Sequence, residues 1–264
     1  MLDESRIRAA LPIGGLGVPL HVLQTVGSTN DHAAELARRG APHGTLVVAD
    51  EQTSGRGRRG RQWFTPAGGA LAVSLVLRPA VLRDVPPAAW NTVGALAVVE
   101  ALRGLGVEAA VKWPNDVLLG GRKVSGVLAE AVWKGDVIEY LILGIGVNIR
   151  PESVPPDADT LFPATCLEQV LGRPVDREEL LARIVGELSV WAPKTASDDW
   201  RRAAESRLAY RGEWVTVQDV GGDVRGKVVG LEWDGRLILE TEAGESFRVG
   251  SGAATIRRMD AAAS

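Results

Sequence analysis

Four arginines fall between Gly55 and Arg61, seven consecutive positions that also hold three glycines. Glycine lets the backbone approach a ligand closely, and the guanidinium group of arginine binds carboxylates and phosphates through paired hydrogen bonds. This composition is typical of a loop that holds two anions together. A basic run by itself is more often a solvated surface loop, and contact with RNA is a further alternative because Trp63 and Phe64 could stack on bases.

The same loop matches the pattern G-x-G-x-x-G of dinucleotide-binding sites. That pattern requires a helix directly after the last glycine, because the helix N-terminus binds the pyrophosphate. Here the chain continues as RQWFTPAGGALAVSLVL, with a proline and then a predicted strand. We therefore reject a dinucleotide-binding fingerprint at this position.

Two further charged residues stand where strands are expected to begin or end. Lys123 follows the predicted tight turn at Gly120-Gly121 and opens a strongly apolar segment. From there its ammonium group can reach a pocket built on a sheet, although a lysine at the start of a strand is usually solvated. Asp116 follows Asn115 at another predicted strand end, where a carboxylate often caps a turn and less often binds a metal.

The positions of these residues depend on a series of short elements. Apolar periodicity and turn residues predict a helix after Ser28 or Thr29, either of which can cap it, with its end at Gly40. A second helix follows Pro86-Pro87, and two or three more lie between 164 and 208, one of them opened by Asp176. Strands are predicted at 19–26, 45–52, 70–79, 110–114, 122–133 and 137–149. Strands joined by tight turns favour antiparallel pairing.

The pattern changes after residue 210. Four short segments of strand character, 213–220, 223–233, 235–241 and 245–250, are separated by turns that contain glycine. Regular short strands of this kind predict a small barrel of about fifty residues. We therefore expect two domains, 1–209 and 210–264.

Composition excludes several classes of protein. The formal net charge is −3, from 30 basic and 33 acidic residues, which argues against a general nucleic-acid binder. Cys166 is the single cysteine, so neither an intrachain disulfide nor a cysteine metal cage can form. No apolar run is long enough for a transmembrane helix, and the first residues lack a signal-peptide pattern. We expect a cytoplasmic protein without a membrane partner.

Taken together, the motifs resemble those of one family. Ser28-Thr29-Asn30, Gln52, GRGRRGRQW, KWPND, RKVSGVLAE and GIGVN occur in the order and spacing found in biotin protein ligases. The resemblance runs through roughly the first two hundred residues, and the predicted barrel is similar to the C-terminal domain of that family. One departure is Ala253-Ala254, where the family commonly has a more polar stretch before its arginine.

The resemblance implies an α+β fold. Its catalytic domain has a mixed, largely antiparallel sheet with flanking helices, like class II aminoacyl-tRNA synthetases, and an SH3-like C-terminal barrel follows. It also implies an enzyme that converts biotin and ATP into biotinyl-5′-AMP, with Mg²⁺, and transfers biotin to a lysine of a biotin carboxyl carrier protein domain. Many members carry an N-terminal DNA-binding domain. About twenty residues precede the first predicted core strand, so we expect that domain to be absent and DNA not to be a partner.

The resemblance also assigns roles to residues of this sequence. The catalytic residues are Lys123, Arg58 and Asp116, and Asp116 is the candidate ligand of Mg²⁺. The biotin-binding residues are Ser28, Thr29, Asn30, Gln52, Gly55, Arg56, Gly57, Arg58 and Lys123. The residues that bind ATP or the adenylate are Arg58, Arg61, Trp63, Asn148 and Arg257.

The physical chemistry of the reaction agrees with these roles. Two like charges about 4 Å apart repel by roughly 4 kcal/mol at an effective dielectric near 20, so a carboxylate and a triphosphate require nearby cations. Biotinyl-AMP is a mixed anhydride that water hydrolyses, which predicts that residues 55–63 form a lid ordered by the ligand. Two alternatives remain: a lipoate ligase of the same reaction class, and a nucleic-acid-binding module that uses the basic loop.

Overall fold

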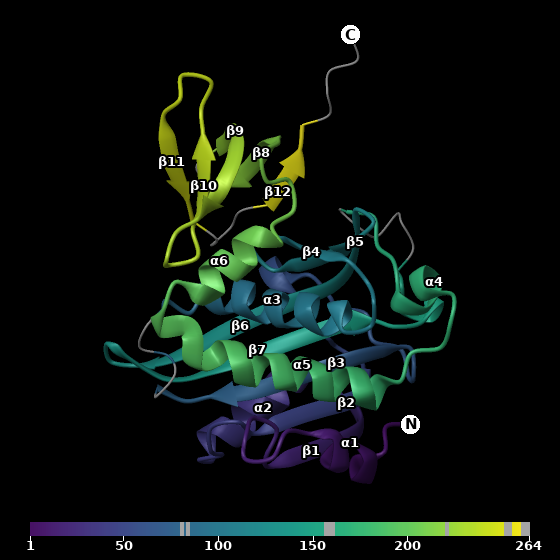
Figure 1. Ribbon diagram of the computed structural model, residues 1–264. Coiled ribbons are helices and arrows are strands. Elements are labelled where there is room, and N and C mark those ends of the chain that lie inside the picture. The colour runs from purple at the N-terminus through teal and green to yellow at the C-terminus, as the bar shows by residue number, and fades with distance from the viewer. Residues whose placement is uncertain (80–81, 83–84, 156–161, 220–221, 251–254, 260–264) are drawn as a thin grey trace.

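The computed structural model describes residues 1–79, 82, 85–155, 162–219, 222–250 and 255–259 (Figure 1). Its larger part is built on one seven-stranded sheet. The strands in chain order are Leu20–Val26 (β1), Leu46–Gln52 (β2), Ala70–Leu77 (β3), Ala109–Lys112 (β4), Asp116–Leu119 (β5), Arg122–Lys134 (β6) and Val137–Asn148 (β7).

The strand order in this sheet is β1-β2-β3-β7-β6-β5-β4. Only β1 and β2 are parallel, and a helix crosses between them; every other pair is antiparallel. Tight turns at Gly120-Gly121 and at Gly135 join β5 to β6 and β6 to β7, and all three glycines have positive φ, a conformation that side chains disfavour. The sheet is therefore mixed and largely antiparallel, as predicted.

Six α-helices surround the sheet in the described part of the chain. They are Glu4–Ala10 (α1), Thr29–Arg38 (α2), Ala89–Arg103 (α3), Leu167–Leu171 (α4), Arg177–Trp191 (α5) and Asp199–Ser206 (α6). Short 3₁₀ turns add Arg58–Gly60 (η1), Pro151–Ser153 (η3) and Ala192–Ala196 (η5). The predicted cap of α5 is confirmed, because Asp176 accepts hydrogen bonds from the backbone N–H groups of Glu178 and Glu179, each at 3.0 Å. No described helix is both long enough and apolar enough to cross a membrane.

The two faces of the sheet are covered by different helices. Helices α3 and α5 pack on one face (Figure 1), where a Cβ on Gly94 of α3 would come within 2.8 Å of Val127. Helix α2 contacts β2, β3 and β7, and its Asn30 lies against Gly144. Leu143 packs near Gly94. Since neighbouring residues of a strand point to opposite faces, α2 covers the face opposite to α3.

The C-terminal part forms a five-stranded antiparallel sheet with the order β11-β10-β9-β8-β12. Its strands are Trp214–Asp219 (β8), Gly222–Leu231 (β9), Leu237–Glu240 (β10), Ser246–Val249 (β11) and Thr255–Arg258 (β12). Its buried side chains share one hydrophobic cluster with Leu96, Trp113 and Leu208 from the larger part. Trp113 Nε1 also donates to the backbone oxygen of Gly235 at 2.9 Å. The two parts therefore pack through a common core.

Three elements differ from the prediction. Helix α1, whose first turn is capped by Asp3, and the four-residue strands β5 and β12 were not expected. Asp116 therefore begins a strand where a strand end had been predicted. Strand β5 follows β4 after only three residues, and β12 depends on contacts with distant segments, namely its pairing with β8 and the burial of Ile256 in the shared hydrophobic cluster. Ala253 and Ala254 lie outside the described residues.

Candidate active site

A cavity of about 950 Å³ opens on the α2 face of the larger sheet. The N-terminal end of α2, the arginine-rich loop, the strands β3, β5, β6 and β7, and β12 of the smaller sheet all contribute to its walls. Every site residue predicted from the sequence lines this one cavity: Ser28, Thr29, Asn30, Gln52, Gly55, Arg56, Gly57, Arg58, Arg61, Trp63, Asp116, Lys123, Asn148 and Arg257.

The floor of the cavity is made by small residues at alternate strand positions. A Cβ on Gly146 of β7 would lie 2.3 Å from the indole ring of Trp63, and one on Gly126 of β6 would lie 3.1 Å from it. A Cβ on Gly144 would lie 2.1 Å from Asn30 Oδ1. Since real Cβ atoms do not approach so closely, these glycines allow Trp63 and Asn30 to lie directly on the sheet.

The arginine-rich loop is a compact hairpin between Gly55 and Trp63. Arg56 pairs with Gln62, and the N–H groups of Gly57 and Trp63 donate to the oxygens of Arg61 and Gly55 at 2.7 and 2.9 Å. A Cβ on Gly55 would lie 2.3 Å from the backbone oxygen of Trp63, so this position requires glycine. The hairpin carries four guanidinium groups on very few residues and places their backbone beside the cavity.

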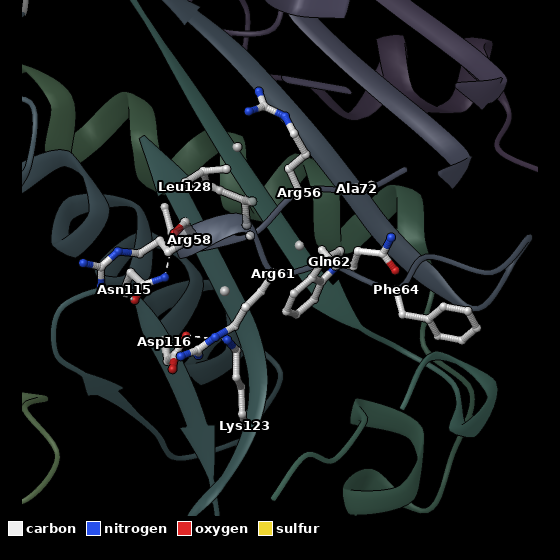
Figure 2. A pocket seen from close by; sticks show the side chains of 18 of the residues that line it. Arg56, Arg58, Arg61, Gln62, Phe64, Ala72, Asn115, Asp116, Lys123 and Leu128 are labelled. Atoms are coloured by element: carbon white, nitrogen blue, oxygen red, sulfur yellow. Dashed lines mark hydrogen bonds and ion pairs between the residues drawn. The ribbon is translucent and has the colours of Figure 1, made fainter. Parts of the chain in front are cut away.

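The loop arginines point in different directions (Figure 2). Arg58 reaches the far wall and donates to Asn115 Oδ1 at 3.1 Å. The side chain of Arg61 extends toward the region of Asp116 and Lys123. Arg56 turns away from these residues. Burial lowers the pKa of Arg58, and its neighbour Arg59 lowers it further, so this cation lies in an environment that an anion would stabilise.

Hydrogen bonds connect the polar wall of the cavity. Gln52 Oε1 accepts from the backbone N–H of Thr29 at 2.8 Å and from its hydroxyl at 3.1 Å. Ser74 Oγ donates to Asn30 Oδ1 at 2.6 Å and lies 2.8 Å from Thr29 Oγ1. The sequence had suggested that Ser28 or Thr29 caps α2 through its side chain. Ser28 does occupy the N-cap position, but its side chain makes no capping hydrogen bond. The hydroxyl of Thr29 is instead bonded to Gln52, the last residue of β2.

Two lysines enclose Asp116, the one carboxylate among the described residues of the cavity wall. Lys123 Nζ lies 2.6 Å from Asp116 Oδ1, and Lys112 Nζ lies 3.3 Å from Oδ2. Burial by itself would raise the pKa of Asp116, but Lys123 and Lys112 outweigh that effect and hold it below its ordinary value. Burial lowers the pKa of Lys112, and Asp116 opposes that change. The cluster carries an excess of positive charge.

This arrangement does not fit a magnesium ion at Asp116. Mg²⁺ takes oxygen ligands in an octahedral shell, whereas both oxygens of this carboxylate face ammonium groups. Within the described ranges, no three His, Cys, Asp or Glu side chains are grouped so that they could hold a metal ion. The predicted metal-binding role of Asp116 therefore has no support in its surroundings, and its neighbours give it the role of an anchor for two lysines.

Trp63, Asn148 and Arg257 also line the cavity. Lys123 Nζ is 5.5 Å from the centre of the Trp63 ring, a cation–π contact. Trp63 Nε1 is buried and has no hydrogen-bond partner in the described part of the chain. Asn148 donates to the oxygen of Thr165 at 3.1 Å, and Arg257 reaches the cavity because β12 pairs with β8. This N–H is therefore available to an acceptor on a ligand or on a water molecule.

Comparisons with known proteins agree with this geometry. The model of the Biotin/lipoate A/B protein ligase family matches residues 22–148, and that of the biotin protein ligase C-terminal domain matches residues 211–256. A biotin–[acetyl-CoA-carboxylase] ligase of Paracoccus denitrificans is 36% identical over 233 residues, which cover 84% of this chain and 95% of that protein. The chain belongs to the biotin protein ligase family.

Two further proteins are similar over most of this chain. The bifunctional ligase/repressor BirA of Bacillus subtilis is 34% identical over 256 residues, 92% of this chain and 76% of that protein. The solved structure of the Aquifex aeolicus biotin protein ligase in complex with biotin and ATP is 33% identical, covers 94% of this chain and 100% of its own, and superposes with a TM-score of 0.77. The predicted fold class, a mixed sheet with helices followed by a small SH3-like domain, is confirmed.

Sequence reasoning left several cavity residues of the ligase without a role. Lys112 and Asn115 belong to the KWPND motif, and Phe162 lies 4.6 Å from Lys112 Nζ, measured to the ring centre. Ile256 also lines the cavity. Glu130 bonds to Arg56 of the loop. The alternation of β6 could have revealed Glu130, since it lies four residues after Gly126 and so faces the same side.

Proposed function

We propose that this ligase joins biotin to AMP at the cavity and then transfers the biotinyl group to a lysine of a biotin carboxyl carrier protein domain. In the first step a carboxylate oxygen of biotin attacks the α-phosphorus of ATP, and pyrophosphate leaves. In the second step the amine of the acceptor lysine attacks the acyl carbon, AMP leaves, and the amine loses a proton. The observation that carries the proposal is a single cavity with a hydrogen-bonding, partly apolar end and a cationic end.

Biotin binds at the end between α2 and the loop. Ser28, Thr29, Asn30 and Gln52 present polar groups beside a floor of strand residues. A ureido ring needs donors and acceptors in such a place, because an unpaired buried polar group costs about 1–3 kcal/mol. The loop backbone from Gly55 to Arg58 closes this end. Arg56 contributes through its backbone, since its side chain points elsewhere.

The carboxylate of biotin and the phosphates bind at the cationic end. Lys123, Lys112, Arg58 and Arg61 line this region together with the carboxylate of Asp116. Lys112 is 4% exposed and its pKa is lowered by burial although Asp116 lies beside it, so a further anion would stabilise its charge. We assign Lys123 to the carboxylate and α-phosphate, and Arg58 and Arg61 to the phosphates. Their charges offset the repulsion between the two anionic substrates.

The adenylate lies along Trp63, with Asn148 and Arg257 beside it. The unpaired Nε1–H of Trp63 donates to an acceptor of the ligand. The hairpin of residues 55–63 covers the mixed anhydride and protects it from water. Support for this assignment comes from the placement of all three side chains on the wall of one cavity.

Five expectations from the sequence stay proposals. The carrier partner follows from relatives that are named biotin–[acetyl-CoA-carboxylase] ligases. Mg²⁺ bound to the triphosphate, the absence of a DNA partner and a cytoplasmic location follow from the resemblance and the composition. The boundary between residues 209 and 210 is supported by two backbone pairings, because Leu208 pairs with β4 whereas Arg211 pairs with β9.

Pyrophosphate exchange tests the first step. The purified chain with ATP should incorporate labelled pyrophosphate into ATP when biotin is present, because adenylate formation is reversible. Lipoate is the matched competitor, since a lipoate ligase catalyses the same reaction class. Exchange that stays at background with biotin and rises with lipoate would refute the assignment. The second step is measured as biotin transfer to a carrier domain, with its acceptor lysine replaced by arginine as the control.

A further inference from the structure

The side chain of Arg56 contacts two carboxylates outside the arginine-rich loop. Its Nη1 and Nη2 donate to both oxygens of Glu130 on β6, at 2.8 and 2.7 Å, and Nη2 also lies 2.8 Å from Asp31 Oδ1 on α2. Figure 2 shows Arg56 directed away from Arg58, Arg61 and Lys123. The guanidinium group therefore fastens the first part of the hairpin to two different elements outside it.

Glu130 also connects this contact to the wall of the cavity. Its Oε2 accepts from Asn30 Nδ2 at 2.7 Å and from Arg56 at the same time. Asn30 Oδ1 in turn accepts from Ser74 Oγ at 2.6 Å, and Asn30 is packed against Gly144. Asn30 is 4% exposed and so has little freedom to move. Glu130 is thus held at a fixed point by the same residue that lines the proposed biotin site.

We propose that Glu130, assisted by Asp31, is a positioning residue that holds the arginine-rich loop closed through Arg56. The proposal rests on the proposed function, because it gives the closed loop the task of retaining biotin and biotinyl-AMP. We call the contact of Arg56 with Glu130 and Asp31 the carboxylate clamp. The carboxylate clamp binds a side chain of the loop, Arg56. It therefore affects how long the ligand is retained and takes no part in the chemical step.

The exposure of the clamp suits a contact that must open and close. The side chains of Arg56, Glu130 and Asp31 are 41%, 33% and 63% exposed. Exposed ion pairs are weak, but a bidentate arginine–carboxylate contact with a fixed carboxylate lies at the strong end of the range. Opening the loop replaces these bonds by bonds to water at modest cost, so substrate can enter. We expect loss of the clamp to change loop opening about three- to tenfold.

Trypsin measures loop opening directly, because the hairpin contains Arg58, Arg59 and Arg61. In the ligand-free full chain, Glu130→Gln should raise the rate of cleavage within the loop about three- to tenfold. Asp31→Asn, which removes one exposed contact, should have a smaller effect. Glu139→Gln on β7 is the matched control, since it replaces an exposed carboxylate of the neighbouring strand. Equal cleavage rates for Glu130→Gln and the unchanged chain would overturn the proposal.

A charge exchange separates a clamp from a general structural role. Arg56→Glu should open the loop, and the double variant Arg56→Glu with Glu130→Arg should restore at least part of the protection. Protection that is not restored would overturn the proposal, because it would show that the residues act independently. The double variant keeps three trypsin sites in the loop, so its cleavage can be compared with that of Arg56→Glu.

Ligand kinetics give the second measurement. Glu130→Gln should release biotinyl-AMP about three- to tenfold faster, and the change should fall on the KM for biotin more than on kcat. A loss confined to kcat would overturn the proposal, because it would place Glu130 in the chemical step. If the unchanged chain shows no pyrophosphate exchange with biotin, the proposed function fails. The trypsin result still decides whether the carboxylate clamp exists.

Discussion

Replacement of Gly146 by alanine tests whether Trp63 must lie flat on the sheet for the reaction. The new Cβ would lie 2.3 Å from Nε1 and Cε2 of the indole ring. Ordinary contacts between such atoms are about 3.5–4.0 Å, so the ring has to retreat by at least about 1 Å. Trp63 belongs to the hairpin, whereas Gly146 belongs to a central strand. The hairpin therefore moves and the strand does not.

The expected magnitude follows from that displacement. A misplacement of about 1 Å in a positioned active site can cost about a hundredfold in rate, which corresponds to about 2.7 kcal/mol of transition-state stabilisation. The free energy of unfolding should fall by less than about 1 kcal/mol, because the displaced ring lies at the edge of the cavity and the core stays packed. Gly146→Ala should therefore reduce the reaction rate strongly and the free energy of unfolding only slightly.

The assay is biotin-dependent pyrophosphate exchange, measured together with urea unfolding. Gly186→Ala in α5 is the matched control, because its Cβ would meet no atom within 4 Å and alanine favours a helix. That variant should keep full exchange and be slightly more stable. Exchange within twofold of the unchanged chain for Gly146→Ala would refute the role of the Trp63 position. A loss of activity that is matched by unfolding would refute the argument that the hairpin yields first.

Three further predictions concern the cationic end and the shared core. Lys123→Ala should lower the rate of adenylate formation about 10²–10³-fold, and normal pyrophosphate exchange in this variant would contradict our placement of the catalytic centre. Arg58→Ala should still form the adenylate but release it, which is detected as free biotinyl-AMP or as labelled bystander lysines. Lys123 and Lys112 outweigh burial and hold the pKa of Asp116 in the folded protein below its ordinary value of 3.8. The ionised carboxylate therefore stabilises the fold fully above pH 3.8, and this stabilisation is lost as the pH falls through the pKa of the folded protein. Asp116→Asn should thus be less stable than the unchanged chain at pH 7, and it should lose less stability between pH 7 and pH 3. Urea unfolding at both pH values measures this, and equal losses in the two chains would contradict the expectation. Trp113→Phe removes the bond to the Gly235 oxygen and should lower the free energy of unfolding by about 1–3 kcal/mol, and an unchanged urea midpoint would show that the two parts do not share this core.

Much of the fold could be predicted from local patterns. The long strands β6 and β7 and the helices α2, α3 and α5 are recognisable, because apolar periodicity over seven or more residues and the turn glycines specify them. The short elements β5 and β12 could not be predicted in this way. Strand β12 is held by its pairing with β8, which lies some forty residues earlier, and by the burial of Ile256 in the shared cluster, and neither contact is local in the sequence.

The same division holds for the site. The motifs of the sequence and their resemblance to the family were enough to identify many of the residues that gather at the cavity, although Lys112, Phe162 and Ile256 were left without a role. Only the tertiary structure decided what each side chain faces. Arg56 turns to Glu130, which is 74 residues away, and Asp116 is held between Lys112 and Lys123. The direction of a side chain depends on strand register and on contacts between distant segments, and neither is encoded in the spacing of a motif.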